Sequence, residues 1–418
     1  MNLSIYTIEK DKNFLLEHKN KLILLSMFNY SNNAKIIKYT SSLLILNLNQ
    51  EQNLKIFLKN NYTFLINSIL NKIIYFNISN NNNTKNNLFH LKNVILNVFS
   101  SLIELINNFY FDDDINKIFV VEFYNYIQKL FPYFDNNIKE KNIKTIDIML
   151  EIFIKISLFQ KNVLLNECKK MKIDINKLNI DIIRMMSDDD YILEKNDKNY
   201  ELIKNLRNLK NNLKLQKCNI CRKLILRLLP LILSKKITFI SKSFQIIKNY
   251  ILLLFVLPLE KEEEENFSEE DPSNVIMSSS LGPIMYELWK PIIFAFHSVS
   301  TNLSLFFSFF EIFDEISNLY PEFFDGDKIF NDLIPCLKDK INFFSGEYKE
   351  GQIIRCIGIM FDFLKKICAK NGYNKKYKND FEKFMEDNKK YFFIGCDDNK
   401  KSIIENDIKR MMFCFTKS

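Results

Sequence analysis

Glycine is almost absent from the first two thirds of this chain. The sequence has 418 residues but only 7 glycines, and the first of them is Gly282. Tight β-hairpins rely on glycine for positive φ angles, and phosphate-binding loops and nucleotide-binding βαβ turns need it where the backbone meets the ligand. Helices have no such requirement, so the scarcity of glycine favours an all-α fold.

Apolar residues recur at helical spacing from end to end. Ile353, Ile357, Met360 and Leu364 follow one another at steps of three and four residues, which places them on one face of a helix. The same pattern predicts amphipathic helices over 13–29, 34–48, 52–76, 88–109, 115–131, 140–158, 160–174, 198–216, 217–233, 236–256, 281–298, 301–320, 327–344, 350–370, 377–392 and 400–415.

These helices are spaced as pairs of roughly 40 residues, which is the period of HEAT and armadillo-like arrays. An apolar–proline–apolar element recurs at Pro230 and Pro335, with a third instance at Pro132. Proline bends a helix because it removes one backbone donor and crowds the preceding turn. First helices of HEAT repeats commonly carry such a bend, so the sequence predicts an α-solenoid of HEAT or armadillo-like helix pairs.

An acidic segment interrupts the array. Residues 260–271 contain eight acidic side chains and one lysine, so they repel one another and have little apolar surface to bury. This predicts an N-terminal helical array over 1–259, an acidic linker or loop over 260–274, and a C-terminal HEAT-like array over 275–418.

Charge and cysteine usage limit the partners and the compartment. The net charge of +8 is spread over 58 basic and 50 acidic residues without an Arg-rich stripe between aromatics, which disfavours a nucleic-acid partner. The N-terminus lacks the features of a secretory signal, and the cysteines fall mostly in apolar helical stretches. Both point to the cytoplasm, or also the nucleus.

Residues 291–310 are uncharged over about the 20 residues that a bilayer crossing requires. Polar side chains from His297 to Ser304 would then lie near the middle of the bilayer. A turn between two packed helices would instead place them in solvent, so we expect no membrane span.

Two cysteines have the spacing of half a zinc site. Cys218 and Cys221 form a C-x-x-C pair, but structural zinc needs four ligands and the nearest histidines, His90 and His297, are far along the chain. The pair also begins a strongly helical run, whereas a redox pair is typical of a βαβ setting. We therefore predict buried helix thiols, no metal and no cofactor.

Catalytic residues are equally hard to assemble. His18, His90 and His297 are the only histidines, and none lies in a recognisable nucleophile context. The aspartates of 112–114 and 188–190 each precede an apolar run, where they would cap a helix. The sequence predicts that the chain is not an enzyme.

Trp289 is the only tryptophan, and it lies between Pro283 and Pro291 in an apolar segment. A tryptophan buries much area, which favours a core anchor, but it is also a common interface hot spot. Tyr286, Pro291 and Phe294 share this segment, so these four residues are the candidates for a partner interface or a core anchor.

The region from about Cys218 to the end resembles the C-terminal HEAT region of the Tel-two-interacting scaffold family. The centre of the similarity is the segment SSLGPIMYELWKPIIFAF (279–296), with its Trp289-Lys290-Pro291 element. Further similar segments are 221–233, 305–320, 322–324, 330–337 and 353–364.

The resemblance implies a scaffold subunit of a Triple-T-like co-chaperone complex. Such a subunit holds the Tel-two protein and the second Tel-two-interacting protein, and the complex supports maturation of phosphatidylinositol-3-kinase-related kinases with the chaperone machinery. Two alternatives stay open. One is an importin- or exportin-like transport receptor, and the other is the helical region of a large Arf exchange factor, which also carries a Trp-Pro-containing segment such as 288–291.

Overall fold

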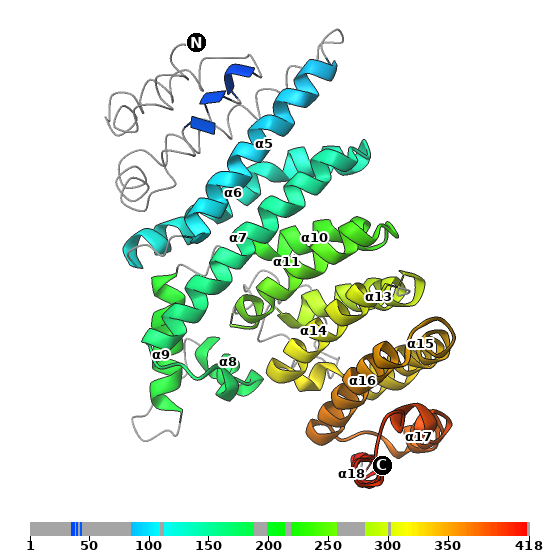
Figure 1. The fold of residues 1–418 in the computed structure, drawn as a ribbon. Helices are drawn as coiled ribbons and strands as arrows, with labels where there is room; N and C mark the ends of the chain where they lie inside the picture. The colour runs from blue at the N-terminus through cyan, green and yellow to red at the C-terminus, as the bar shows by residue number, and fades with distance from the viewer. Residues whose placement is uncertain are drawn as a thin grey trace. The chain divides into compact units, whose positions relative to one another are not determined.

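The computed structural model describes residues 35–37, 39–40, 42–43, 85–108, 113–187, 199–213, 219–256, 281–299 and 302–415. These residues are mostly helical, and they contain no β-strand (Figure 1). The prediction of an all-α protein is therefore confirmed for this part of the chain. The helices predicted over 13–29 and 52–76, and most of the one over 34–48, lie outside the described residues.

The chain divides into two compact units, Met1–Leu164 and Leu165–Ser418. Their boundary falls within helix α7 (Ile143–Lys170). The acidic segment 260–274, at which the sequence predicts a division, lies outside the described residues. The helices directly before and directly after this segment both belong to the second unit. A division of the chain at the acidic segment therefore stays a prediction.

The first unit contains α5 (Lys85–Asn108), α6 (Asp113–Lys139) and most of α7. Side-chain hydrogen bonds join its helices. The Lys155 ammonium on α7 donates to Ser100 Oγ at 2.9 Å and to Glu104 at 2.7 Å, both on α5. Phe123 of α6 meets Phe159 of α7 edge to face, with ring centroids 5.2 Å apart. The polar contacts lie beside an aromatic core that holds the three helices together.

Helix α7 is one helix where the sequence predicts two, over 140–158 and 160–174. Polar residues near the predicted break have hydrogen-bond partners within α7 or on the neighbouring helix α6. Ser157 Oγ donates to Ile154 O at 2.9 Å, and Gln160 Nε2 donates to Val120 O on α6 at 3.2 Å. Because these buried side chains have partners, they do not interrupt the helix.

Tyr133 on α6 makes the stability of the first unit depend on pH. Burial raises the pKa of its phenol to about 12, although hydrogen bonds with Asn137 and Thr145 oppose the rise. Between pH 10 and 12 the folded protein retains a proton that the unfolded chain loses, so this contribution is complete below pH 10 and is lost as the pH rises to 12. It amounts to at most about 3 kcal/mol.

We therefore expect the wild-type free energy of unfolding to fall more steeply than that of Tyr133→Phe between pH 10 and 12. Urea denaturation at each pH, followed by circular dichroism, measures this difference. Parallel pH curves for the two proteins would contradict the prediction.

The second unit contains α-helices and several short 3₁₀ and π segments. They are η1 (Ile175–Lys177), α8 (Ile180–Ser187), α9 (Tyr200–Asn212), α10 (Asn219–Ile232), α11 (Ile237–Phe255), α13 (Leu281–Val299), α14 (Leu303–Leu319), the 3₁₀ turn η4 (Pro321–Phe323), the π-helix η5 (Asp327–Leu333), α15 (Ile334–Glu347), α16 (Glu350–Lys370), η6 (Lys375–Tyr377), α17 (Lys378–Phe392) and α18 (Asp398–Met412). The predicted bounds agree with most of these within a few residues, whereas α8 was not predicted.

From α10 onward the helices form two rows. Helices α10, α13, α15 and α17 pack one against the next, and we call them the first-helix row. Helices α11, α14, α16 and α18 do the same and form the second-helix row. The pairs α10–α11, α13–α14, α15–α16 and α17–α18 also pack within themselves (Figure 1). The unit is thus built of successive helix pairs in two layers.

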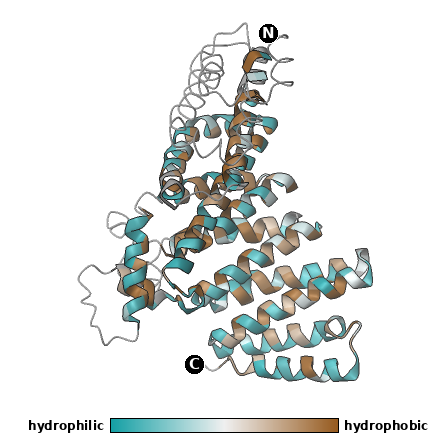
Figure 2. Ribbon diagram, turned by 60° about the vertical axis from the view of Figure 1, so that its left-hand side comes forward, coloured by the Kyte–Doolittle hydropathy of each residue, from teal (hydrophilic) through white to brown (hydrophobic). Residues whose placement is uncertain are grey.

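Phenylalanines of α14 join the surrounding helices. Phe309 meets Phe244 of α11 and Phe296 of α13, each with centroids 4.6 Å apart. Phe310 meets Phe363 of α16 at 5.6 Å. Figure 2 shows apolar and polar residues alternating along individual helices, as expected for helices that bury one face.

All three recurring prolines lie in helices, and two of them lie in the first-helix row. Pro230 lies in α10, and Pro335 is close to the start of α15, while in the first unit Pro132 lies inside α6, which precedes α7. The sequence predicts an α-helix over 327–344, but its first part is the π-helix η5. There the Ile334 N–H donates to Ile329 O, in the wider i→i−5 pattern, immediately before the proline.

The uncharged stretch 291–310 is divided between two helices. Helix α13 ends at Val299, and Asn302 caps α14, because its Oδ1 accepts from the Ser304 N–H at 2.9 Å and the Leu305 N–H at 3.3 Å. Among the helices that the structure describes, none is both long and apolar enough to span a bilayer.

Candidate functional site

Helix α13 places the predicted site residues on two different faces. Trp289 points into the core and is only 3% exposed. Tyr286 and Phe294 are 60% and 48% exposed, and Pro291 is half-buried. Tyr286, Lys290 and Phe294 are spaced four residues apart, so they share one exposed stripe of the helix. The four candidates therefore separate into a buried tryptophan, a half-buried proline and two exposed aromatics.

The buried indole of Trp289 is held by rings and by one carboxylate. Its centroid lies 5.7 Å from that of Phe313 and 5.6 Å from that of Phe323. Its Nε1–H donates to Asp332 Oδ2 at 2.7 Å. A buried indole N–H needs such a partner, and Asp332 supplies it from the π-helix η5.

Asp332 also receives the neighbouring ammonium. Lys290 Nζ lies 2.6 Å from Asp332 Oδ1 and 2.8 Å from Oδ2. The carboxylate side chain is 18% exposed, whereas that of Lys290 is 74% exposed. One partly buried carboxylate thus fixes both a core residue and a surface residue of α13.

Further contacts hold the C-terminal part of α13 against α15. Lys340 Nζ donates to His297 O at 2.9 Å, and His297 Nε2 lies 3.3 Å from Asp339 Oδ2. Burial lowers the pKa of Lys340. With Asp332, these bonds hold α13 along its length, so its exposed stripe is displayed by a fixed backbone.

Lys328 lies beneath one end of the stripe. Its Nζ is 5.2 Å from the ring centroid of Tyr286 and 4.9 Å from that of Phe323, and it pairs with Asp325. These cation–π contacts orient the Tyr286 ring without covering it. The ring stays available to a partner.

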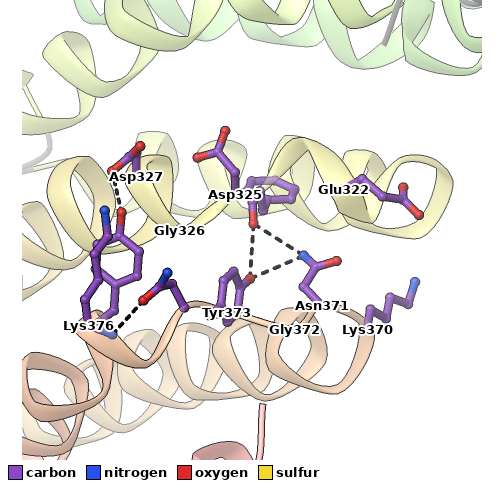
Figure 3. Close-up of a pocket in the computed structure, with 12 residues that line it drawn as sticks. Glu322, Asp325, Gly326, Asp327, Lys370, Asn371, Gly372, Tyr373 and Lys376 are labelled. Atoms are coloured by element: carbon purple, nitrogen blue, oxygen red, sulfur yellow. Dashed lines mark hydrogen bonds between the residues drawn. The ribbon is translucent and has the colours of Figure 1, made fainter. Parts of the chain in front are cut away.

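A second feature is a cavity of about 380 Å³ between two loops that connect successive helix pairs (Figure 3). One loop runs from η4 into η5, and the other joins α16 to α17. The cavity is lined by Glu322, Phe324, Asp325, Gly326, Asp327, Lys370, Asn371, Gly372, Tyr373, Asn374, Lys376 and Tyr377.

Many polar groups of this cavity bond to each other or to nearby carbonyls. Asn371 Nδ2 donates to Pro321 O at 2.8 Å and to Phe324 O at 3.3 Å, and Tyr373 Oη donates to the same Phe324 O at 3.1 Å (Figure 3). Tyr377 Oη donates to Asp327. These bonds anchor one loop on the other.

Lys370, which also lines the cavity, has a hydrogen-bond partner as well. Lys370 Nζ donates to Ser317 O at 2.8 Å, at the C-terminal end of α14, where a cation is favourable. Burial, together with Lys366, lowers its pKa. The hydrogen bonds of the lining residues therefore hold the two loops together around the cavity.

The remaining candidates are scattered. Cys221 is fully buried in α10, and Cys218 lies outside the described residues. Helix α6 begins at Asp113, in agreement with a role of that acidic run at a helix start, whereas 188–190 and His18 lie outside the described part. Within the described ranges, no group of three or more His, Cys, Asp or Glu side chains could hold a metal ion.

Sequence reasoning did not find the loop cavity or the Trp289–Asp332 bond. Both depend on residues about 40–50 positions apart, which helical periodicity does not relate. Gly326, Gly372 and Pro321 are turn residues and could have marked the two loops. Their proximity to each other has no signal in the sequence.

The described part of the chain is an all-α protein built from packed helix pairs. No family model matches the sequence, and the searches found no similar curated protein and no similar solved structure.

Proposed function

We propose that this chain is a non-catalytic, helical-repeat scaffold of the α-solenoid type, and that it binds other helical proteins through the exposed stripe of α13. On the basis of the resemblance of its C-terminal half, we propose that the chain and these proteins form a Triple-T-like co-chaperone complex. This complex supports the maturation and stability of phosphatidylinositol-3-kinase-related kinases. It acts in the cytoplasm, and also in the nucleus.

One observation carries this proposal. Tyr286 and Phe294 expose large aromatic surfaces on a helix that Trp289, Asp332 and Lys340 hold in place. Aromatic side chains on a preorganised backbone are typical hot spots, because little conformational entropy is lost when a partner covers them. The two rows of helices give the unit the layered packing expected of a HEAT-like array.

The test is affinity purification of the tagged chain from its native cell. The double variant Tyr286→Ala/Phe294→Ala should recover at least about tenfold less of its helical-repeat partners than the wild type, because hot spots cost 2 kcal/mol or more each. Its melting temperature should stay near that of the wild type, since both side chains are exposed.

The matched control is Ile403→Ala/Phe413→Ala, at and just beyond α18, where the side chains are 59% and 77% exposed. This control should bind like the wild type. Depletion of the chain should lower the abundance of the kinases without changing their messenger levels. Nucleotide-dependent capture of a Ran-type or Arf-type GTPase, with kinase levels unchanged, would favour the transport receptor or the exchange factor instead.

A further inference from the structure

The cavity between the two loops has walls of opposite charge. The loop from η4 into η5 brings the carboxylates of Glu322, Asp325 and Asp327, and the loop from α16 to α17 brings the ammonium groups of Lys370 and Lys376 (Figure 3). Both loops belong to the second unit. A ligand that enters the cavity therefore meets anionic acceptors on one side and cationic donors on the other.

One end of the cavity is bridged by a side chain of the protein itself. Tyr377 Oη donates to Asp327, and Lys376 Nζ lies 4.5 Å from the ring centroid of Tyr377. A hydrogen bond with Tyr377 raises the pKa of Lys376. Tyr377 thus connects the acidic wall with the basic wall, and the charges at this end are satisfied within the fold.

At the other end, no described side chain connects the two walls. Glu322 and Lys370 point toward the same space in Figure 3, but they form no ion pair with each other. Glu322 is exposed and has no hydrogen-bond or ion-pair partner among the described residues. Two unlike charges are therefore held apart, with the cavity between them.

Asn371 adds a further acceptor at this open end. Its Nδ2 donates to two carbonyls of the opposite loop, which fixes the amide group, and its Oδ1 points toward the end at which Glu322 and Lys370 lie (Figure 3). That oxygen accepts no hydrogen bond from a described residue. Lys370 donates one of its three N–H groups to Ser317 O. The open end thus offers two acceptors and one cationic donor.

These three groups define the chemistry of a ligand. The two acceptors suit an ammonium group, and the remaining N–H groups of Lys370 suit a carboxylate. An inorganic anion would be repelled by Glu322, and a metal ion would be repelled by Lys370, so neither matches both walls. The volume of about 380 Å³ is near the lower end of the range for ligand pockets, which suits a small molecule.

We propose that this cavity binds a free α-amino acid, whose α-ammonium contacts Glu322 and Asn371 and whose α-carboxylate contacts Lys370. The amino acid joins the two walls at the open end, as Tyr377 does at the other end. This site is separate from the exposed stripe of α13, so the inference goes beyond the scaffold function and does not depend on it.

Isothermal titration calorimetry of the full chain with each of the standard L-amino acids tests this proposal. We expect at least one of them to bind and to raise the melting temperature. Its N-acetyl derivative and its amide should each bind at least about tenfold more weakly, because each lacks one of the two charges. Binding of none of the amino acids, or equal affinity for the N-acetyl derivative or for inorganic phosphate, would overturn the proposal.

A pair of matched variants locates the binding. Glu322→Gln keeps the shape of the side chain but removes its charge, so it should bind the amino acid at least about tenfold more weakly. Its melting temperature without ligand should equal that of the wild type, because Glu322 has no described partner to lose. The control Glu382→Gln changes an exposed glutamate of α17 that does not line the cavity, and it should bind like the wild type. Equal affinities of the two variants would contradict the assignment to this cavity.

Discussion

Replacing Trp289 by alanine is expected to lower the free energy of unfolding of the second unit by about 3–5 kcal/mol. The change removes a side chain that is only 3% exposed, and it opens a cavity beside Phe313 and Phe323. It also deprives Asp332 of the indole N–H that it accepts at 2.7 Å. Chemical denaturation followed by circular dichroism measures the loss.

Two variants separate the causes of this loss. Trp289→Phe keeps a ring in the core but removes the N–H, so we expect it to cost about 1–3 kcal/mol. Tyr286→Ala, on the exposed side of the same helix, should cost less than about 1 kcal/mol. A Trp289→Ala protein as stable as Tyr286→Ala would show that the indole is not a core anchor.

Alanine at two glycines should change stability in opposite directions. A Cβ at Gly326 would lie 2.4 Å from Tyr377 Cε2, although the φ of −61° there suits any residue. Gly326→Ala must displace the Tyr377 ring and its hydrogen bond to Asp327, at a cost of about 1–3 kcal/mol. A Cβ at Gly358, inside α16, meets nothing within 4 Å.

Gly358→Ala is therefore expected to stabilise the protein by about 0.5–1 kcal/mol, because it limits the unfolded chain and suits a helix. Urea denaturation of both variants, followed by the fluorescence of Trp289, reports on the second unit. Equal shifts of the same sign would mean that the contact between the two loops of the cavity does not support the fold.

The helices of the second unit could be predicted closely from the sequence. The predicted range 350–370 coincides with α16, and 236–256 differs from α11 by one residue at each end. This succeeds because the spacing of apolar residues along one helix is a local property. It fails at α7, where Gln160 is satisfied by Val120 on another helix, and at η5, where the first turns before Pro335 are π-helical.

The candidate site, like the helices, could be predicted only in part from the sequence. The composition and the segment around Trp289 were enough to single out Tyr286, Trp289, Pro291 and Phe294, but not to assign a face to each of them. The structure buries Trp289 and exposes Tyr286 and Phe294, because α15 and the aromatic residues after α14 pack on one side of α13 only.

By itself, the sequence determined that the described part of this chain is helical. It also determined where most of the described helices of the second unit begin and end, since glycine scarcity and apolar periodicity act through each segment alone. Only the tertiary structure decided that Asp332 holds Trp289 and that Gly326 makes room for Tyr377. These contacts join residues about 40–50 positions apart, and local pattern carries no information about which distant surfaces pack together.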